Sequence, residues 1–201
     1  MITFYFDCSS PWTWLGFHNI QPLARELGVE VDWKPILVGG VFNAVNDSVY
    51  EARKAPVGPK ARYHGKDLQD WARLAGLKIK MPPSVFPVNS VKVMRACILL
   101  KPEGKLVDFA TEAFRIYWSE DQDISRDEIV REICARAGVD ADRVMAGIQD
   151  QALKDELRAN TDELIARGGF GSPTMFVGDD MYFGNDRLVL VAEAVKRARA
   201  E

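Results

Sequence analysis

A short strand that runs directly into a helix, at the start of the chain, most constrains the fold. Residues 2–6 (ITFYF) are apolar and rich in β-branched and aromatic side chains, as a strand favours, and residues 7–10 end it. Pro11 then opens an amphipathic stretch, which predicts a helix with Ser10 as its N-cap. The Ser10 hydroxyl is therefore expected at a helix N-terminus, where free N–H groups and the macrodipole favour an anion, thiolates included.

A serine before a proline is common at helix starts, and on its own Ser10 is interpreted as an N-cap only. The other end of the chain changes this interpretation, because residues 171–178 read GSPTMFVG and residues 182–188 read YFGNDRL. This pair of motifs resembles the thioredoxin-like superfamily, in which a Cys-x-x-Cys opens the first helix and a distant proline, usually cis, faces it. Residues 10–13 read SPWT here, so the redox pair is absent.

The closer resemblance is to the 2-hydroxychromene-2-carboxylate isomerases and the kappa-class glutathione transferases, which carry Ser-Pro in place of the first cysteine. The middle of the chain also matches, at residues 60–63 (KARY), 67–72 (DLQDWA) and 86–90 (FPVNS). Two strands early, two strands late and helices between them give the order βαβ…αββα. We therefore expect an α/β protein with a thioredoxin-like fold and a large all-helical insertion, as in DsbA and the kappa-class transferases.

The chain is expected to form a single domain over residues 1–201. Its thioredoxin parts are placed at about 1–38 and 150–201, with the helical insertion at about 39–149. Within these parts the pattern predicts a helix end at Gly28, a strand over 29–33, a loop over 35–59, and helices over 59–76 and from 87. It also predicts a capping box at 125–128, a short helix capped by Asp140, a helix over 151–167 and a hairpin turn at 178–180.

Composition excludes several classes of function. A chain of 201 residues buries a substantial core without metal or disulfide staples. The net charge of −3 argues against a nucleic-acid partner, which requires a basic surface. No run of eighteen apolar residues occurs, and Met1 leads straight into a strand, so we expect no membrane partner and a cytoplasmic location. Three widely spaced cysteines fit reduced thiols, and two isolated histidines predict no metal site.

The resemblance also implies a glutathione site. Ser10 would hold the glutathione sulfur, and Ser172, before Pro173, would offer its backbone to the tripeptide. Asn185 and Asp186 would both cap the last helix and bind the γ-glutamyl end. The other expected contacts are a basic residue for glutathione, Lys60, and substrate contacts from Trp12, Asn43, Asn46 and Asn89. Asn43 stands where many of the isomerases carry a lysine.

The resemblance implies a glutathione-dependent isomerase that interconverts 2-hydroxychromene-2-carboxylate and trans-o-hydroxybenzylidenepyruvate, or a near analogue, in aromatic catabolism. The helix N-terminus and Ser10 would lower the pKa of the glutathione thiol, which would add to the substrate and later leave. A kappa-like glutathione transferase is the second hypothesis, and a thioredoxin-like binding protein without redox activity is the third. A homodimer with a small aromatic substrate is expected, also from the resemblance.

Overall fold

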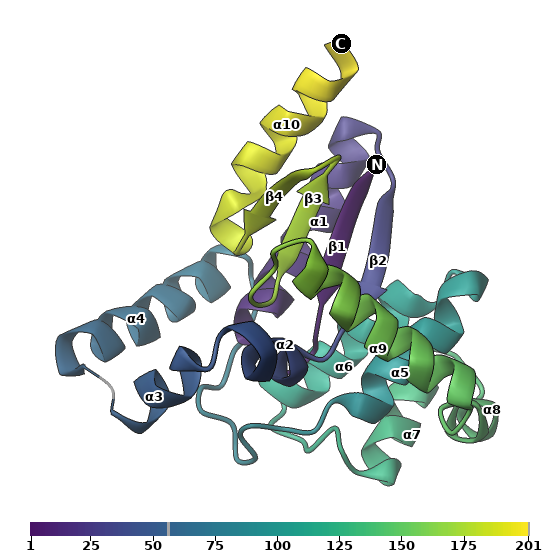
Figure 1. Ribbon diagram of the computed structural model, residues 1–201. Helices are drawn as coiled ribbons and strands as arrows, with labels where there is room; N and C mark the ends of the chain where they lie inside the picture. The colour runs from purple at the N-terminus through teal and green to yellow at the C-terminus, as the bar shows by residue number, and fades with distance from the viewer. Residues whose placement is uncertain (56, 201) are drawn as a thin grey trace.

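The two ends of the chain build one sheet. A computed structural model describes residues 1–55 and 57–200 and shows four strands in the order β2-β1-β3-β4 (Figure 1). The strands are β1 (Ile2–Phe6), β2 (Val31–Pro35), β3 (Thr174–Val177) and β4 (Asp180–Phe183). β1 is parallel to β2 and antiparallel to β3, and β3 is antiparallel to β4. This mixed sheet confirms the expected thioredoxin-like topology.

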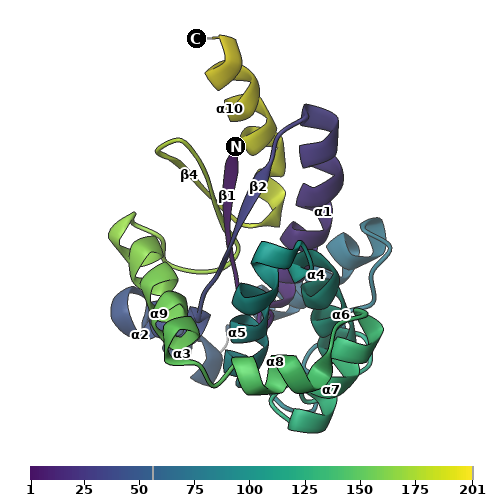
Figure 2. The same ribbon diagram turned by 90° about the vertical axis from the view of Figure 1, so that its right-hand side faces the viewer.

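Helices cover both faces of the sheet and one of its ends. They are α1 (Pro11–Leu27), α2 (Val38–Val45), α3 (Ser48–Lys54), α4 (Gly58–Leu74), α5 (Val91–Leu100), α6 (Leu106–Trp118), α7 (Asp127–Arg136), α8 (Ala141–Gly147), α9 (Gln151–Ala166) and α10 (Leu188–Ala200). α1 and α10 lie on one face, α9 lies on the other, and α5 to α8 gather where β1 and β2 end (Figures 1 and 2). Among the described residues, the segments between β2 and β3 contribute only helices and loops.

The first helix begins and ends where the sequence predicts. Ser10 is its N-cap, because the Oγ atom accepts a hydrogen bond from the backbone N–H of Thr13 at 3.2 Å, and Pro11 occupies the first turn. Gly28 ends it in the left-handed conformation, with φ of 59°. The helix therefore leaves β1 at a fixed angle and returns the chain to β2.

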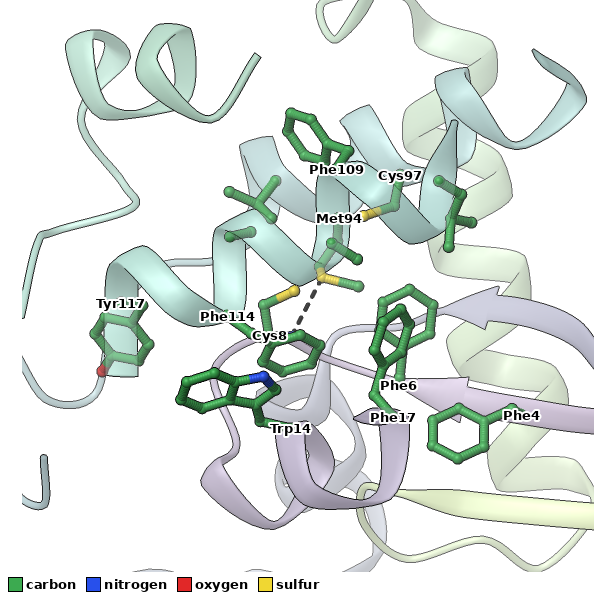
Figure 3. Close-up of a cluster of buried hydrophobic side chains, with 14 of the residues drawn as sticks. Phe4, Phe6, Cys8, Trp14, Phe17, Met94, Cys97, Phe109, Phe114 and Tyr117 are labelled. Carbon is green, nitrogen blue, oxygen red and sulfur yellow. Dashed lines mark hydrogen bonds between the residues drawn. The ribbon is translucent and has the colours of Figure 1, made fainter. Parts of the chain in front are cut away.

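The core joins the sheet to the helical insertion. Trp14 of α1 stacks on Phe114 of α6, with their rings 2° from parallel, and Phe17 contacts both Phe6 of β1 and Phe114 (Figure 3). All of these side chains are buried. Since the insertion supplies part of the core beneath the sheet, we expect the two to fold together.

Two of the predicted elements are wrong in the middle of the chain. The predicted loop over 35–59 contains α2 and α3 instead, although residue 56 lies outside the described residues. The predicted helix at Pro87 begins only at Val91, because the Asn89 side chain accepts a hydrogen bond from the Val91 N–H and keeps the preceding residues outside the helix.

Smaller differences occur at the boundaries of other elements. The capping box at Ser125 does not form, because the Ser125 hydroxyl donates to Asp123 at 2.7 Å and α7 begins at Asp127. β2 lies two residues later than predicted, and β4 already begins at Asp180. The helix predicted over 151–167 is confirmed as α9.

Candidate functional site

Ser10 lies between the start of α1 and the loop before β3. Its hydroxyl donates to the backbone carbonyl of Ser172 at 3.3 Å while accepting from Thr13. The peptide bond between Ser172 and Pro173 is cis, as the resemblance predicts. The residues expected to face each other from opposite ends of the chain therefore do so.

A second hydroxyl joins the same two segments, and sequence reasoning missed it. Thr13 Oγ1 lies 2.7 Å from Ser172 Oγ, and both side chains are buried. Ser172 Oγ also accepts from the backbone N–H of Asp7 at 3.2 Å. The available signal was position, since Thr13 stands where the second cysteine of the redox motif would be.

An apolar cavity of about 610 Å³ opens on one side of Ser10. Aromatic rings from five segments line it, namely Trp12, Phe42, Tyr50, Phe86 and Phe183. Its polar lining is Asp7, Ser9, Ser10, Asn46, Asn89, Ser90 and Ser172. Because most of the wall is apolar and the polar groups are few, the cavity fits a small aromatic molecule.

A more polar cleft of about 340 Å³ lies on the other side of Ser172. It is lined by Asn185 and Asp186 near the start of α10, and by His64 and Asp67 of α4. Asn185 is only 3% exposed, its Oδ1 accepts from the Asn19 amide, and its Nδ2 has no partner among the described residues. A buried donor without a partner costs about 1–3 kcal/mol, so this amide is suited to a ligand acceptor.

The cavity and the cleft meet at one wall. Trp12, Ser172 and Phe183 line both of them. A ligand that extends through the cleft would therefore reach Ser10 at the edge of the cavity.

The other predicted site residues divide between the site and the surface. Asn46 and Asn89 line the cavity. Asn43 does not, because its side chain accepts from the Tyr50 hydroxyl at 2.8 Å on the outer surface. Lys60 is exposed on α4 and lines neither space. His64 and Asp67, on the same helix as Lys60, were not predicted as site residues.

Two ionisable groups before Ser10 are fully buried. Burial raises the pKa of the Asp7 carboxyl, although hydrogen bonds partly offset this effect. Burial, followed by a hydrogen bond with Cys97, raises the pKa of the Cys8 thiol well above its usual range. Figure 3 shows Cys8 between Met94 and the aromatic core. The backbone N–H of Cys8 donates a hydrogen bond to the Met94 sulfur, with 3.4 Å between nitrogen and sulfur. Cys8 is therefore a poor nucleophile.

The family model for the DSBA-like thioredoxin domain matches residues 1–196. The chain belongs to the DsbA-like thioredoxin family. The serine and threonine at positions 10 and 13 make it a member without the redox cysteines at the start of α1.

Relatives with known names fall into two groups within this family. A 2-hydroxychromene-2-carboxylate isomerase of Pseudomonas putida is 28% identical over 98% of this chain and 95% of the relative. A glutathione S-transferase kappa 1 of Rattus norvegicus is 26% identical over 96% and 89%. A solved structure of 2-hydroxychromene-2-carboxylate isomerase superposes with a TM-score of 0.84 at 26% identity, over 98% of this chain and 95% of that one. The chain is thus related to both isomerases and transferases.

Two further findings bear on the classes excluded above. Within residues 1–55 and 57–200, no helix is long and apolar enough to cross a membrane. The same residues contain no cluster of three histidine, cysteine or acidic side chains that could hold a metal ion.

Proposed function

We propose that the protein is a glutathione-dependent isomerase that acts on a conjugated aromatic compound such as 2-hydroxychromene-2-carboxylate. The observation that carries the proposal is the place of Ser10 in the wall of an apolar cavity that shares Trp12, Ser172 and Phe183 with a polar cleft. The names of the isomerase relatives, with almost complete coverage of both chains, support the reaction type.

The cleft offers glutathione a complementary set of groups. The unpaired Asn185 amide donates to the γ-glutamyl carboxylate. Asp186, which accepts from Arg187 of the same cleft at 2.7 Å, also pairs with the ammonium group. The backbone of Ser172 binds the extended part of the tripeptide. Asp67 adds a second acidic group for the ammonium, whereas the exposed Lys60 would have to reach the ligand from outside the cleft.

Ser10 holds the sulfur at the edge of the cavity. The hydroxyl that now donates to the Ser172 carbonyl turns to donate to the thiolate, while the first N–H groups of α1 add positive potential. When bound, glutathione would supply a thiolate nucleophile for reversible addition to the conjugated substrate, whose ring C–O bond must also open to give the free phenol. The aromatic walls of the cavity hold the ring of the substrate and exclude water, and Asn46 and Asn89 are placed to contact its polar substituents.

Stoichiometry separates an isomerase from a kappa-like transferase. An isomerase returns the thiol, whereas a transferase keeps it in the product. We would supply 2-hydroxychromene-2-carboxylate in large excess over glutathione, and follow substrate by absorbance and thiol by titration. We expect constant thiol while the substrate reaches equilibrium. Thiol that falls in proportion to product would instead support the transferase.

Calorimetric titration with glutathione tests the binding site itself. We expect the Asp186→Asn variant to bind more weakly than the parent, because the ammonium group loses its partner. Asp179→Asn is the matched control, since Asp179 is exposed in the turn before β4 and lines neither space. No heat of binding for the parent protein would favour a thioredoxin-like binding protein of another kind.

We also propose that the protein works as a homodimer in the cytoplasm. The reduced state expected for its three buried thiols fits that compartment.

A further inference from the structure

One buried carboxylate, that of Asp7, forms hydrogen bonds with several of the segments that surround the cavity. Asp7 follows β1, and its Oδ1 accepts from the Ser9 N–H at 2.9 Å. Its Oδ2 accepts from the Val38 N–H, also at 2.9 Å. Hydrogen bonding by the Ser90 and Ser9 side chains also lowers the pKa of this carboxyl. Asp7 is 1% exposed and belongs to the cavity wall.

These three partners mark the starts of three different helices. Ser9 directly precedes the N-cap of α1, Val38 is the first residue of α2, and Ser90 is the N-cap of α5. Neither α2 nor α5 has a side-chain cap of its own. At α2, the Asp7 carboxylate therefore takes the place that a local capping residue normally has, because it accepts from the first N–H of that helix.

No lysine, arginine or histidine among the described residues is a cause of the pKa shift of Asp7, which comes from burial and hydrogen bonds. The titratable groups that sense its charge are the Cys8 thiol, which follows it in the chain, and the Tyr117 phenol of α6. Both have raised pKa values and are neutral at pH 7. The hydrogen bonds from Ser9, Val38 and Ser90 are what favour the charged form.

We propose that Asp7 is a positioning residue whose carboxylate holds the starts of α1, α2 and α5 together and thereby fixes Ser10 against the cavity. Both carboxylate oxygens are already occupied by protein donors, so its action on the substrate passes through these segments. When Asp7 is protonated, one oxygen becomes a donor and can no longer accept equally, and the three helix starts lose their common anchor.

Nuclear magnetic resonance tests this proposal without reference to any activity. The ¹H–¹⁵N signals of Ser9 and Val38 are followed from pH 3 to pH 8 in the full chain. We expect both to shift with one shared midpoint above the ordinary Asp value. In Ser90→Ala this midpoint should rise further, because the carboxylate loses a hydrogen bond. Separate midpoints, or no change in Ser90→Ala, would overturn the proposal.

Steady-state kinetics tests the consequence for the site, and this arm alone rests on the proposed function. We expect Asp7→Asn to lower kcat/KM about tenfold or more, as small displacements of catalytic groups do, and to remove the acid limb that Asp7 contributes to the pH profile. Asp140→Asn is the matched control: Asp140 also accepts two backbone N–H groups, but at the start of α8 and on the surface.

The two arms distinguish the possible failures. An Asp7→Asn variant with unchanged kcat/KM and pH profile would overturn the positioning role. If the parent enzyme shows no isomerase activity, the proposed function fails, and the shared midpoint of Ser9 and Val38 still decides the anchoring role. If Asp7→Asn does not fold, Ser90→Ala still has the Asp7 carboxylate, and kcat/KM and the pH profile are measured on that variant instead.

Discussion

Replacing Ser10 with alanine removes two interactions whose effects appear in different measurements. The first is the N-cap of α1, since Ser10 Oγ accepts from the Thr13 N–H at 3.2 Å. Loss of such a cap costs about 1 kcal/mol of stability, within a range of about 0.5–2 kcal/mol. The second is the proposed hydrogen bond to the glutathione thiolate, which would be worth about 1.5–3 kcal/mol because the acceptor is charged.

The second loss converts to a rate. Since about 1.4 kcal/mol corresponds to a factor of ten, Ser10→Ala should lower kcat/KM by roughly 10- to 150-fold. Unfolding in urea measures the loss of stability, and initial rates with 2-hydroxychromene-2-carboxylate and glutathione measure the loss of activity.

A matched control separates the cap from the chemistry. Asp150 is the N-cap of α9, where it accepts from the Ala152 N–H at 3.0 Å, and it lines neither the cavity nor the cleft. Asp150→Ala should therefore lose about the same stability with full activity. If Ser10→Ala behaved in the same way as Asp150→Ala, Ser10 would be a helix cap only, and the proposed contact with the thiolate would be wrong.

Three further substitutions test the surroundings of the site. Gly16→Ala should lower the urea midpoint, because a Cβ atom there would lie 2.9 Å from Pro173 Cγ. The cost of this overpacking, about 1–3 kcal/mol, exceeds the gain of about 1 kcal/mol from the higher helix propensity of alanine. An unchanged midpoint would contradict the contact. Cys8→Ala should keep full turnover, and a folded but inactive variant would make Cys8 the nucleophile. Hydrogen bonds from Lys80 and then from Ser84 lower the pKa of Asp121 to about 2, so the parent should be more stable than Asp121→Asn above pH 4 and lose this advantage towards pH 2. Urea unfolding at several pH values measures this, and equal stability throughout would mean that these contacts contribute nothing.

The parts of the fold that sequence predicts well are those with local causes. The start of α1 depends on Ser10 and Pro11, its end depends on Gly28, and all three signals lie within a turn of the boundary that they set. The cap at Asp140 is equally local and was also predicted. Such features need no knowledge of what packs against them.

The missed elements depend on partners far away in the chain. The start of α2 has no capping residue in its own sequence, because the carboxylate that accepts from the Val38 N–H belongs to Asp7. Without a local capping signal, the sequence predicts a loop over this segment. The apparent capping box at Ser125 shows the converse, since a matching local pattern was overridden by a hydrogen bond to Asp123.

Sequence predicts the site residues that belong to a recognisable motif, and it misses those that only the packing of the helices brings to the site. Ser172 and Asn185 follow from the resemblance of the two ends of the chain. Thr13 and Asp67 reach the site because α1 meets the loop before β3, and because α4 packs beside the start of α10. No local pattern distinguishes these two side chains from ordinary helix residues.

If the proposed function holds, the hydroxyls at positions 10 and 13 explain why a diffusible thiol suits this member of the family. Ser10 and Thr13 both hydrogen bond to Ser172, one to its carbonyl and one to its hydroxyl. Hydroxyl groups form such bonds more strongly than thiols do, so the two segments are held together without a sulfur at the start of α1. The anion-stabilising end of the helix then has no nucleophile of its own, and a bound thiolate can occupy it. Recognition of that thiol consequently passes to the cleft, where the unpaired amide of Asn185 lies.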